Sequence, residues 1–286
     1  MKKTSIITAV ALVTSFGLVG CSGGSSDSSS TPTVSTSSIT GQAIDPELVG
    51  ATVCLDLNRD GICNEGEPSA TTNEEGTYSL NLTNEQLNGG YSLIAVNGVD
   101  RESGEAFKGK LFADVTGSYQ NITPLTTLAY KEMQVSMEKL ENALGLTYEE
   151  IQANIIVLAN EGNTKALQVA LTLQKSAEAI APRDTIQFYK DLAQQINRAD
   201  ERDDLRTSIL EVTPQNLKGE ISSLVETILN SRLSEAYALA EEARMRAIAL
   251  GIDHITMLEM LPDTPEVPEM PETTDEDPTP ISIPTI

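Results

Sequence analysis

The chain has little material for chemistry that depends on histidine, tryptophan or free thiols. Its 286 residues include no tryptophan, three cysteines and a single histidine, His254. One imidazole excludes sites built from several histidines, and His254, beside a predicted helix end, is interpreted as a structural or solvated residue. A structural zinc ion takes about four Cys or His ligands, so we expect no zinc site.

Basic residues are also scarce. The chain carries 19 Lys and Arg against 42 Asp and Glu, which gives a formal net charge of −23. Nucleic acids and anionic lipid surfaces both repel such a chain, so we expect no nucleic-acid partner and no direct electrostatic attraction to a membrane. An acidic chain is instead suited to divalent cations.

Long hydrophobic runs are absent except at the N-terminus. There, Lys2 and Lys3 precede an apolar stretch from Ile6 to Val19, which is short for a bilayer span and typical of a signal peptide. The stretch ends Leu18-Val19-Gly20-Cys21, which resembles the bacterial lipobox. Residues 1–20 are therefore predicted to be a lipoprotein signal peptide and Cys21 the lipidated residue. The alternative is an ordinary secretory signal followed by a chance cysteine.

The residues after the cysteine indicate where the lipid anchor is placed. Ser22 resembles the outer-membrane default of Gram-negative lipoproteins, in which Asp at this position marks inner-membrane retention. Residues 21–38 are mostly Ser, Gly and Thr and are predicted to form a flexible tether. We therefore expect a lipid-anchored outer-membrane protein that faces the periplasm or the cell surface, since several acyl chains suffice for stable anchoring.

The two remaining cysteines, Cys54 and Cys63, form an even pair in an exported chain. The oxidising setting favours a disulfide between them. Two free thiols or a metal pair are the alternatives.

Residues 39–122 show short, alternating apolar runs separated by Asn, Gly and Asp. Candidate strands cover residues 53–57, 78–82, 91–96 and 107–115. Alternation with a period of two and this spacing of turn residues predict a small antiparallel β-sandwich.

An acidic segment between two of these strands, residues 56–67, matches the calcium-loop pattern D-x-[DN]-x-[DN]-G-x5-E at every specified position. Calcium prefers oxygen ligands, and Gly61 permits the sharp turn that this spacing needs. The predicted ligands are the side chains of Asp56, Asn58, Asp60, Asn64 (directly or through water) and Glu67, with the backbone carbonyl of Ile62.

The context of this loop differs from an EF-hand, because a strand precedes it, Pro68 follows it and Cys63 takes its eighth position. The calcium chemistry is therefore predicted without the helix-loop-helix fold. Strand alternation places Cys54 on the same face as Asp56, so a Cys54–Cys63 bridge would pin the base of the loop. The alternative is an acidic turn that binds no metal.

A family resemblance follows from the strings Gly50-Ala51-Thr52-Val53-Cys54-Leu55-Asp56, Gly66-Glu67-Pro68 and Thr72-x3-Gly76-x-Tyr78-x-Leu80. They resemble a calcium-loop variant of the prealbumin-like sandwich, as in carboxypeptidase-regulatory-like modules and Sdr-type B repeats. The version with two cysteines is similar to modules of Gram-negative outer-membrane lipoproteins. The resemblance implies a stalk, spacer or binding platform.

From Thr123-Pro124 the apolar period changes to that of amphipathic helices, so residues 123–260 are predicted to be a helical domain and the fold class α+β. A first helix is expected from Pro124 to Leu144, and Thr147 with Glu150 forms a capping box. Further helices are expected near 164–181, from Asp184 onward, and from Pro214 to Gly251. The apolar stripes of these helices predict the core of a small helical bundle. The alternative for the Ala-rich face over 236–249 is that it docks a partner helix. Residues 261–286 are predicted to be a disordered acidic tail.

Catalytic signatures are missing: the sequence contains no G-x-S-x-G, no H-E-x-x-H and no phosphate-binding loop. We therefore predict a non-catalytic, lipid-anchored envelope or cell-surface protein, a calcium-stabilised binding, adhesion or scaffold module with a protein or envelope-polymer partner. The alternatives are an accessory factor for assembly or secretion at the outer membrane, and a carboxylate-dependent enzyme acting on envelope polymers.

Overall fold

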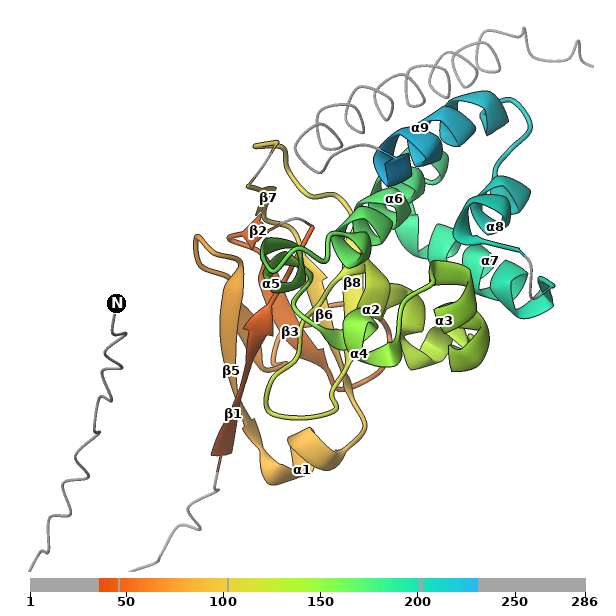
Figure 1. Ribbon diagram of the computed structural model, residues 1–286. Coiled ribbons are helices and arrows are strands. Elements are labelled where there is room, and N and C mark those ends of the chain that lie inside the picture. The colour runs from red at the N-terminus through yellow and green to blue at the C-terminus, as the bar shows by residue number, and fades with distance from the viewer. Residues whose placement is uncertain (1–35, 46, 102, 201–202, 231–286) are drawn as a thin grey trace, which may run out of the picture. The chain divides into compact units, whose positions relative to one another are not determined.

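The computed structural model describes residues 36–45, 47–101, 103–200 and 203–230. Strands occupy the first part of this range and helices the second, which confirms the α+β class (Figure 1). The predicted signal peptide, Cys21 and the predicted acidic tail lie outside the described residues. None of the helices within those residues is both long enough and apolar enough to cross a membrane.

The strands form three small antiparallel sheets. The largest has the order β4-β3-β6-β8, with the bounds β4 (Ser69–Thr71), β3 (Thr52–Asp56), β6 (Ser92–Val96) and β8 (Lys110–Asp114). The other two sheets are pairs: β1 (Thr36–Gln42) with β5 (Thr77–Thr83), and β2 (Leu48–Val49) with β7 (Val99–Asp100).

Both faces of the four-stranded sheet are apolar. Along β3, Val53 and Leu55 belong to a core cluster that also contains Ile39 of β1 and Leu80 of β5, so this core lies between the two larger sheets. Cys54, which points to the opposite face, belongs to a second cluster together with the helices. The predicted alternation in β3 is therefore confirmed, and each face has its own core.

Strand β1 begins at Thr36, inside the segment that the sequence assigned to the tether. Its first residues pair with the end of β5 in the register Thr36↔Thr83 and Ser38↔Asn81. The pairing is made by backbone groups, which do not depend on side-chain polarity, so a Ser- and Thr-rich stretch joins the sheet although its side chains stay exposed.

One short helix, α1 (Asn84–Asn88), follows β5. The other helices follow the last strand and are α2 (Pro124–Ala129), α3 (Met137–Leu144), α4 (Tyr148–Gln152), α5 (Ile155–Asn160), α6 (Lys165–Ile180), α7 (Thr185–Arg198), α8 (Leu205–Val212) and α9 (Lys218–Asn230). The predicted starts of α2 and α7 and the predicted span of α6 are confirmed within one or two residues. The capping box of Thr147 and Glu150 is present at α4.

The first predicted helix is wrong in one respect, because it does not run unbroken from Pro124 to Leu144. Tyr130 adopts an extended backbone (ψ 134°), and a 3-10 turn, η1 (Lys131–Met133), ends at Gln134 with φ 54°. The ring of Tyr130 stacks on Phe112 of β8 with centroids 5.0 Å apart. The sequence pattern on both sides of Tyr130 is helical, but packing of Tyr130 against the sheet overrides it and interrupts the helix.

The last predicted helix begins later than expected, at Lys218, and the structure describes it as far as Asn230. The rest of that prediction, with His254 and the Ala-rich face over 236–249, lies outside the described residues.

Strands and helices share a hydrophobic core. The second cluster joins Ile44, Ile94 and Phe112 of the strand half to buried residues of α2, α6 and α7. Residue 123 therefore marks the change from strands to helices, while the packing continues across it.

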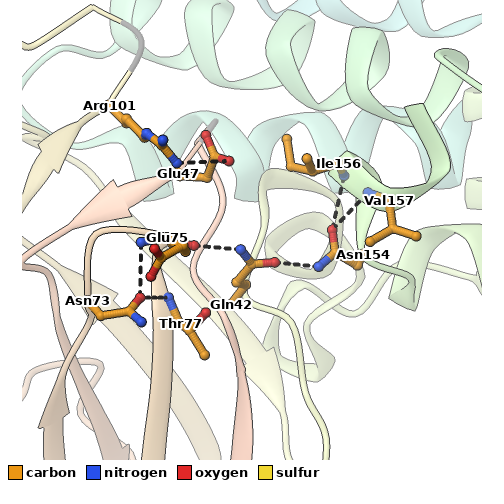
Figure 2. A network of polar contacts seen from close by, with 9 residues as sticks. All are labelled: Gln42, Glu47, Asn73, Glu75, Thr77, Arg101, Asn154, Ile156 and Val157. Atoms are coloured by element: carbon orange, nitrogen blue, oxygen red, sulfur yellow. Dashed lines mark hydrogen bonds and ion pairs between the residues drawn. The ribbon is translucent and has the colours of Figure 1, made fainter. Parts of the chain in front are cut away.

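Polar contacts also cross between the two halves (Figure 2). Gln42, at the end of β1, donates from Nε2 to the carbonyl oxygen of Glu75 at 2.5 Å and accepts a hydrogen bond from Nδ2 of Asn154. Asn73 organises the turn before β5 by accepting from the backbone N–H of Glu75 and Thr77 at 3.1 and 2.8 Å. The turn, β1 and the start of α5 are thus linked.

Candidate functional site

The acidic loop joins β3 to β4, and the carboxylate of Asp56 organises its first turn. Asp56 ends β3 and is only 1% exposed. Its Oδ1 accepts from the backbone N–H of Asp60 at 3.2 Å, and its Oδ2 accepts from that of Gly61 at 3.0 Å. Gly61 has φ 72°, so the predicted need for glycine at this turn is met.

Glu67 closes the loop from its other end. Oε1 of Glu67 accepts from the backbone N–H of Leu57, and Oε2 accepts from that of Asn64, both at 2.8 Å. A single carboxylate thus ties the second residue of the loop to its ninth. The loop is held closed by charge-assisted hydrogen bonds to backbone donors.

Asp60 lies at the centre of the side-chain contacts. Its Oδ1 accepts from the backbone N–H of Ile62 at 2.8 Å, and its Oδ2 accepts from Nδ2 of Asn58 and of Asn64, both at 2.9 Å. The hydrogen bond from Asn64 is the main reason that the pKa of the Asp60 carboxyl is lowered, and the contacts from Asn58 and Ile62 act in the same direction. Asp60 is therefore ionised at neutral pH.

Two basic side chains, one from β8 and one from the loop itself, tie the loop to its surroundings. Nζ of Lys110, on β8, donates to the carbonyl oxygen of Gly61 at 2.8 Å. The guanidinium of Arg59 lies 5.6 Å from the ring centroid of Tyr91 and donates to the carbonyl oxygen of Gly89 at 3.2 Å. These contacts connect the loop to β8 and to the segment before β6.

A disulfide between Cys54 and Cys63 spans the loop, as the sequence predicted. The two sulfur atoms are 2.00 Å apart and the Cα atoms 5.7 Å apart. Cys54 is fully buried in the core that faces the helices, whereas Cys63 belongs to the exposed loop. The bridge therefore anchors the middle of the loop to the hydrophobic core.

The predicted metal ligands of the loop are all oxygen atoms, the kind of ligand that calcium prefers. The carboxylate oxygens of Asp56, Asp60 and Glu67 accept hydrogen bonds from N–H groups, and amide nitrogens of Asn58 and Asn64 point at Asp60. Within the described residues, no three His, Cys, Asp or Glu side chains are grouped so that they could hold a metal ion, and this includes the carboxylates of the loop. The residue types fit calcium, and the arrangement is that of a loop closed by its own hydrogen bonds.

A buried charged cluster was missed by sequence reasoning. Nζ of Lys175, on α6, lies 3.8 Å from Oδ2 of Asp100 on β7 and 3.4 Å from Oε2 of Glu178. The side chains of Lys175 and Asp100 are less than a tenth exposed, and all three residues line a cavity of about 180 Å³. A lysine within the apolar pattern of α6 was the available sequence signal. Its partner Asp100, however, lies 75 residues earlier in the chain.

Polar contacts extend this cluster into the helical core. Nε2 of Gln174 donates to Oε1 of Glu178 at 3.1 Å, and the hydroxyl of Tyr189 donates to Oε1 of Gln174 at 3.0 Å. Burial raises the pKa of Tyr189 well above its ordinary value. The cluster thus links β7, α6 and α7 through charged and polar groups that are removed from water.

Comparison with protein-family models, curated proteins and solved structures found no match to this chain.

Proposed function

We propose that the chain is a non-catalytic, lipid-anchored protein of the bacterial envelope or cell surface, whose β module is a calcium-stabilised binding, adhesion or scaffold platform. The observation that carries the proposal is the loop from Asp56 to Glu67, in which every predicted calcium ligand lies in one turn bridged by Cys54–Cys63. An oxygen-rich loop whose ends are tied together by Glu67 and whose middle is held by the disulfide is suited to a structural ion.

Calcium binding would use side chains that now accept or donate hydrogen bonds within the loop. Asp56, Asp60 and Glu67 supply carboxylates, Asn58 and Asn64 supply amide oxygens, and Ile62 supplies its carbonyl. An amide presents either nitrogen or oxygen by rotating half a turn about its last side-chain bond, so Asn58 and Asn64 could turn an oxygen toward the ion in place of the N–H that each now donates to Asp60. Bound calcium would neutralise carboxylate charge and stiffen the loop.

The sheet of β3, β4, β6 and β8 shares a core with the β1–β5 pair, and the acidic loop follows β3. We infer a β-sandwich of the prealbumin-like, calcium-loop kind, with the helical half forming a small bundle against its outer face. Relatives of that kind serve as stalks and platforms, which favours a binding or scaffold role over catalysis.

The anchor is proposed from the sequence, because Cys21 lies outside the described residues. The lipobox ending in Cys21, with Ser22 after it, supports processing at Cys21 and delivery to the outer membrane. A binding platform on such an anchor would be held at the membrane whatever its own charge.

Fractionation of cells that express the full chain tests the anchor. Wild-type protein is expected in the outer-membrane fraction with a lipidated Cys21, whereas Cys21→Ala should remain unprocessed or be released. Normal processing and membrane retention of Cys21→Ala would contradict the proposal. Protease treatment of intact cells then separates surface display from a periplasmic location.

Crosslinking of envelopes followed by mass spectrometry tests the role. Recovery of the chain with an envelope polymer or a surface protein would support a binding or scaffold role. Recovery within an assembly or secretion machine would instead support the accessory-factor alternative.

A further inference from the structure

A cleft of about 570 Å³ lies beside the acidic loop. Its walls come from the loop, from β8 with the residues just before it, from η1 and from the start of α7. Three largely buried side chains, Phe112, Tyr130 and Met133, contribute apolar surface, and the first two stack with an interplanar angle of 10°. The volume is in the range of small-molecule sites, roughly 300–1,000 Å³.

The charge of the cleft is opposite to that of the chain. Three acidic side chains line it, namely Asp60, Glu132 and Asp184. Five basic side chains line it, namely Arg59, Lys108, Lys110, Arg183 and Lys190. The lining therefore carries a net charge of +2, in a protein whose net charge is −23 and which has only 19 Lys and Arg.

None of these five cations forms an ion pair with a carboxylate in the described part of the chain. Lys110 and Arg59 contact backbone carbonyl oxygens instead, those of Gly61 and Gly89. The side chains of Lys108, Arg183 and Lys190 are exposed and make no hydrogen bond or ion pair within the described residues. Lys110 is still near enough to Asp60 to lower the pKa of that carboxyl. In a chain with more than twice as many acidic as basic residues, a group of cations that form no ion pair with a carboxylate is suited to an external anion.

Two of the three acidic groups are already engaged. Both oxygens of Asp60 accept hydrogen bonds within the loop. Asp184 caps α7, with Oδ1 accepting from the backbone N–H of Gln187 at 3.3 Å. Both groups keep their negative charge, but these oxygens are already engaged with protein donors, and the basic groups of the lining still outnumber the acidic ones by two.

We propose that this cleft binds a small oligoanion, a ligand with two or more phosphate or carboxylate groups on a partly apolar or sugar-like body. Arginine matches the planar geometry of either anion with paired donors, and lysine adds charge without a fixed direction. The apolar patch of Phe112, Tyr130 and Met133 would contact the uncharged faces of the ligand. Envelope polymers carry both anions, so either is a chemically reasonable source.

This inference goes beyond the calcium-stabilised platform proposed above and is independent of calcium, although Arg59, Asp60 and Gly61 belong to both regions. The two proposals are separated by working with EDTA-washed protein and no added divalent cation. An anion that binds under these conditions is not held through a metal ion.

The test is isothermal titration calorimetry of the full chain in detergent with tripolyphosphate, trigalacturonate and the neutral maltotriose. Binding of either anionic probe, weakened by added NaCl and without comparable binding of maltotriose, is expected. Tripolyphosphate alone would point to a phosphate source and trigalacturonate alone to a carboxylate source. Failure of both probes to bind at millimolar concentration would overturn the proposal.

Matched variants locate the site. Arg183→Gln combined with Lys190→Gln should weaken binding of the anionic probe by about tenfold or more, since charge-assisted contacts are the stronger kind. Arg198→Gln, at the other end of α7 and outside the cleft lining, should bind as the wild type does. Circular dichroism confirms that each variant is folded. Equal affinity of the double variant and the wild type would contradict the assignment.

Discussion

Asn154 and Gln42 are 112 residues apart in the chain and are joined by an amide–amide hydrogen bond between the helical and the strand half (Figure 2). The same Asn154 side chain caps α5, because its Oδ1 accepts from the backbone N–H of Ile156 and Val157, both at 3.1 Å. One residue thus begins a helix and fixes that helix to the end of β1. Its two functions are carried by different atoms and can be separated by substitution.

Replacing Asn154 is predicted to separate the cap from the link. Asn154→Ala loses both and should reduce the free energy of unfolding by about 1–2 kcal/mol. Asn154→Asp keeps the capping oxygen but has no N–H to donate to Gln42. It should therefore reduce the free energy of unfolding by less than Asn154→Ala does. Chemical denaturation of the full chain measures both values. Equal losses for the two variants would show that the cap contributes nothing measurable.

Calcium is predicted to raise the melting temperature of the β module through Glu67. At a calcium concentration a hundredfold above Kd, binding to the folded state alone adds about 2.7 kcal/mol. Glu67→Gln should lose most of this increment, because it removes a carboxylate from the ligand set. The exposed neighbour Glu65, which lies outside the ligand pattern, provides the matched control Glu65→Gln, which should keep the increment.

The measured quantity is the difference between the melting temperature in calcium and that in EDTA. Glu67→Gln is also expected to melt somewhat earlier than the wild type in EDTA, since Glu67 accepts from Leu57 and Asn64 in this structure. Scanning calorimetry reports both effects. No shift of the wild type at millimolar calcium would show that the loop is an acidic turn that does not bind the metal.

Removing the disulfide is predicted to destabilise the protein mainly through the unfolded chain. Cys54 and Cys63 are nine residues apart. Closing a loop of about ten residues is worth about 2.7 kcal/mol on the loop-entropy model. Cys54→Ala with Cys63→Ala should lose about this amount in chemical denaturation, and a reducing agent should lower the stability of the wild type alone. Peptide mapping without reduction that finds two free thiols would contradict the bridge.

Alkaline pH is predicted to unfold the protein through buried tyrosines. Burial raises the pKa of Tyr78 and of Tyr189 far above their ordinary value. Their neutral forms are therefore favoured in the folded state, so stability is unaffected below about pH 10 and falls as pH rises above it, where unfolded tyrosine ionises. Ultraviolet absorbance measures tyrosine ionisation without interference, because the chain has no tryptophan. Full ionisation of the tyrosines before unfolding would contradict the prediction.

Tyr78→Phe tests one of these sites directly. The Tyr78 hydroxyl donates to the carbonyl oxygen of Gln120 at 2.5 Å in a buried setting. Its removal leaves that oxygen without the donor and should cost about 1–2 kcal/mol of unfolding free energy. Tyr119 is 56% exposed, so Tyr119→Phe should change the free energy little in the same denaturation experiment.

Short-range features of this protein could be predicted from its sequence because the groups concerned are close in the chain. The acidic loop occupies twelve successive residues, so spacing alone brought together Asp56, Asp60 and Glu67. The capping box of Thr147 and the face on which Cys54 lies follow from local periodicity in the same way. Backbone geometry over one or two turns decides such features, and the residue pattern records it.

Other features were decided by residues far apart in the chain. The helical pattern continues through Tyr130, yet stacking on Phe112 ends the helix there. Lys175 meets Asp100, and Lys190 lines the same cleft as Arg59, only because segments far apart in the chain pack side by side. Periodicity shows that a face is buried but not against which partner, because burial of apolar surface is non-directional. The charged cluster and the basic cleft are therefore products of tertiary packing.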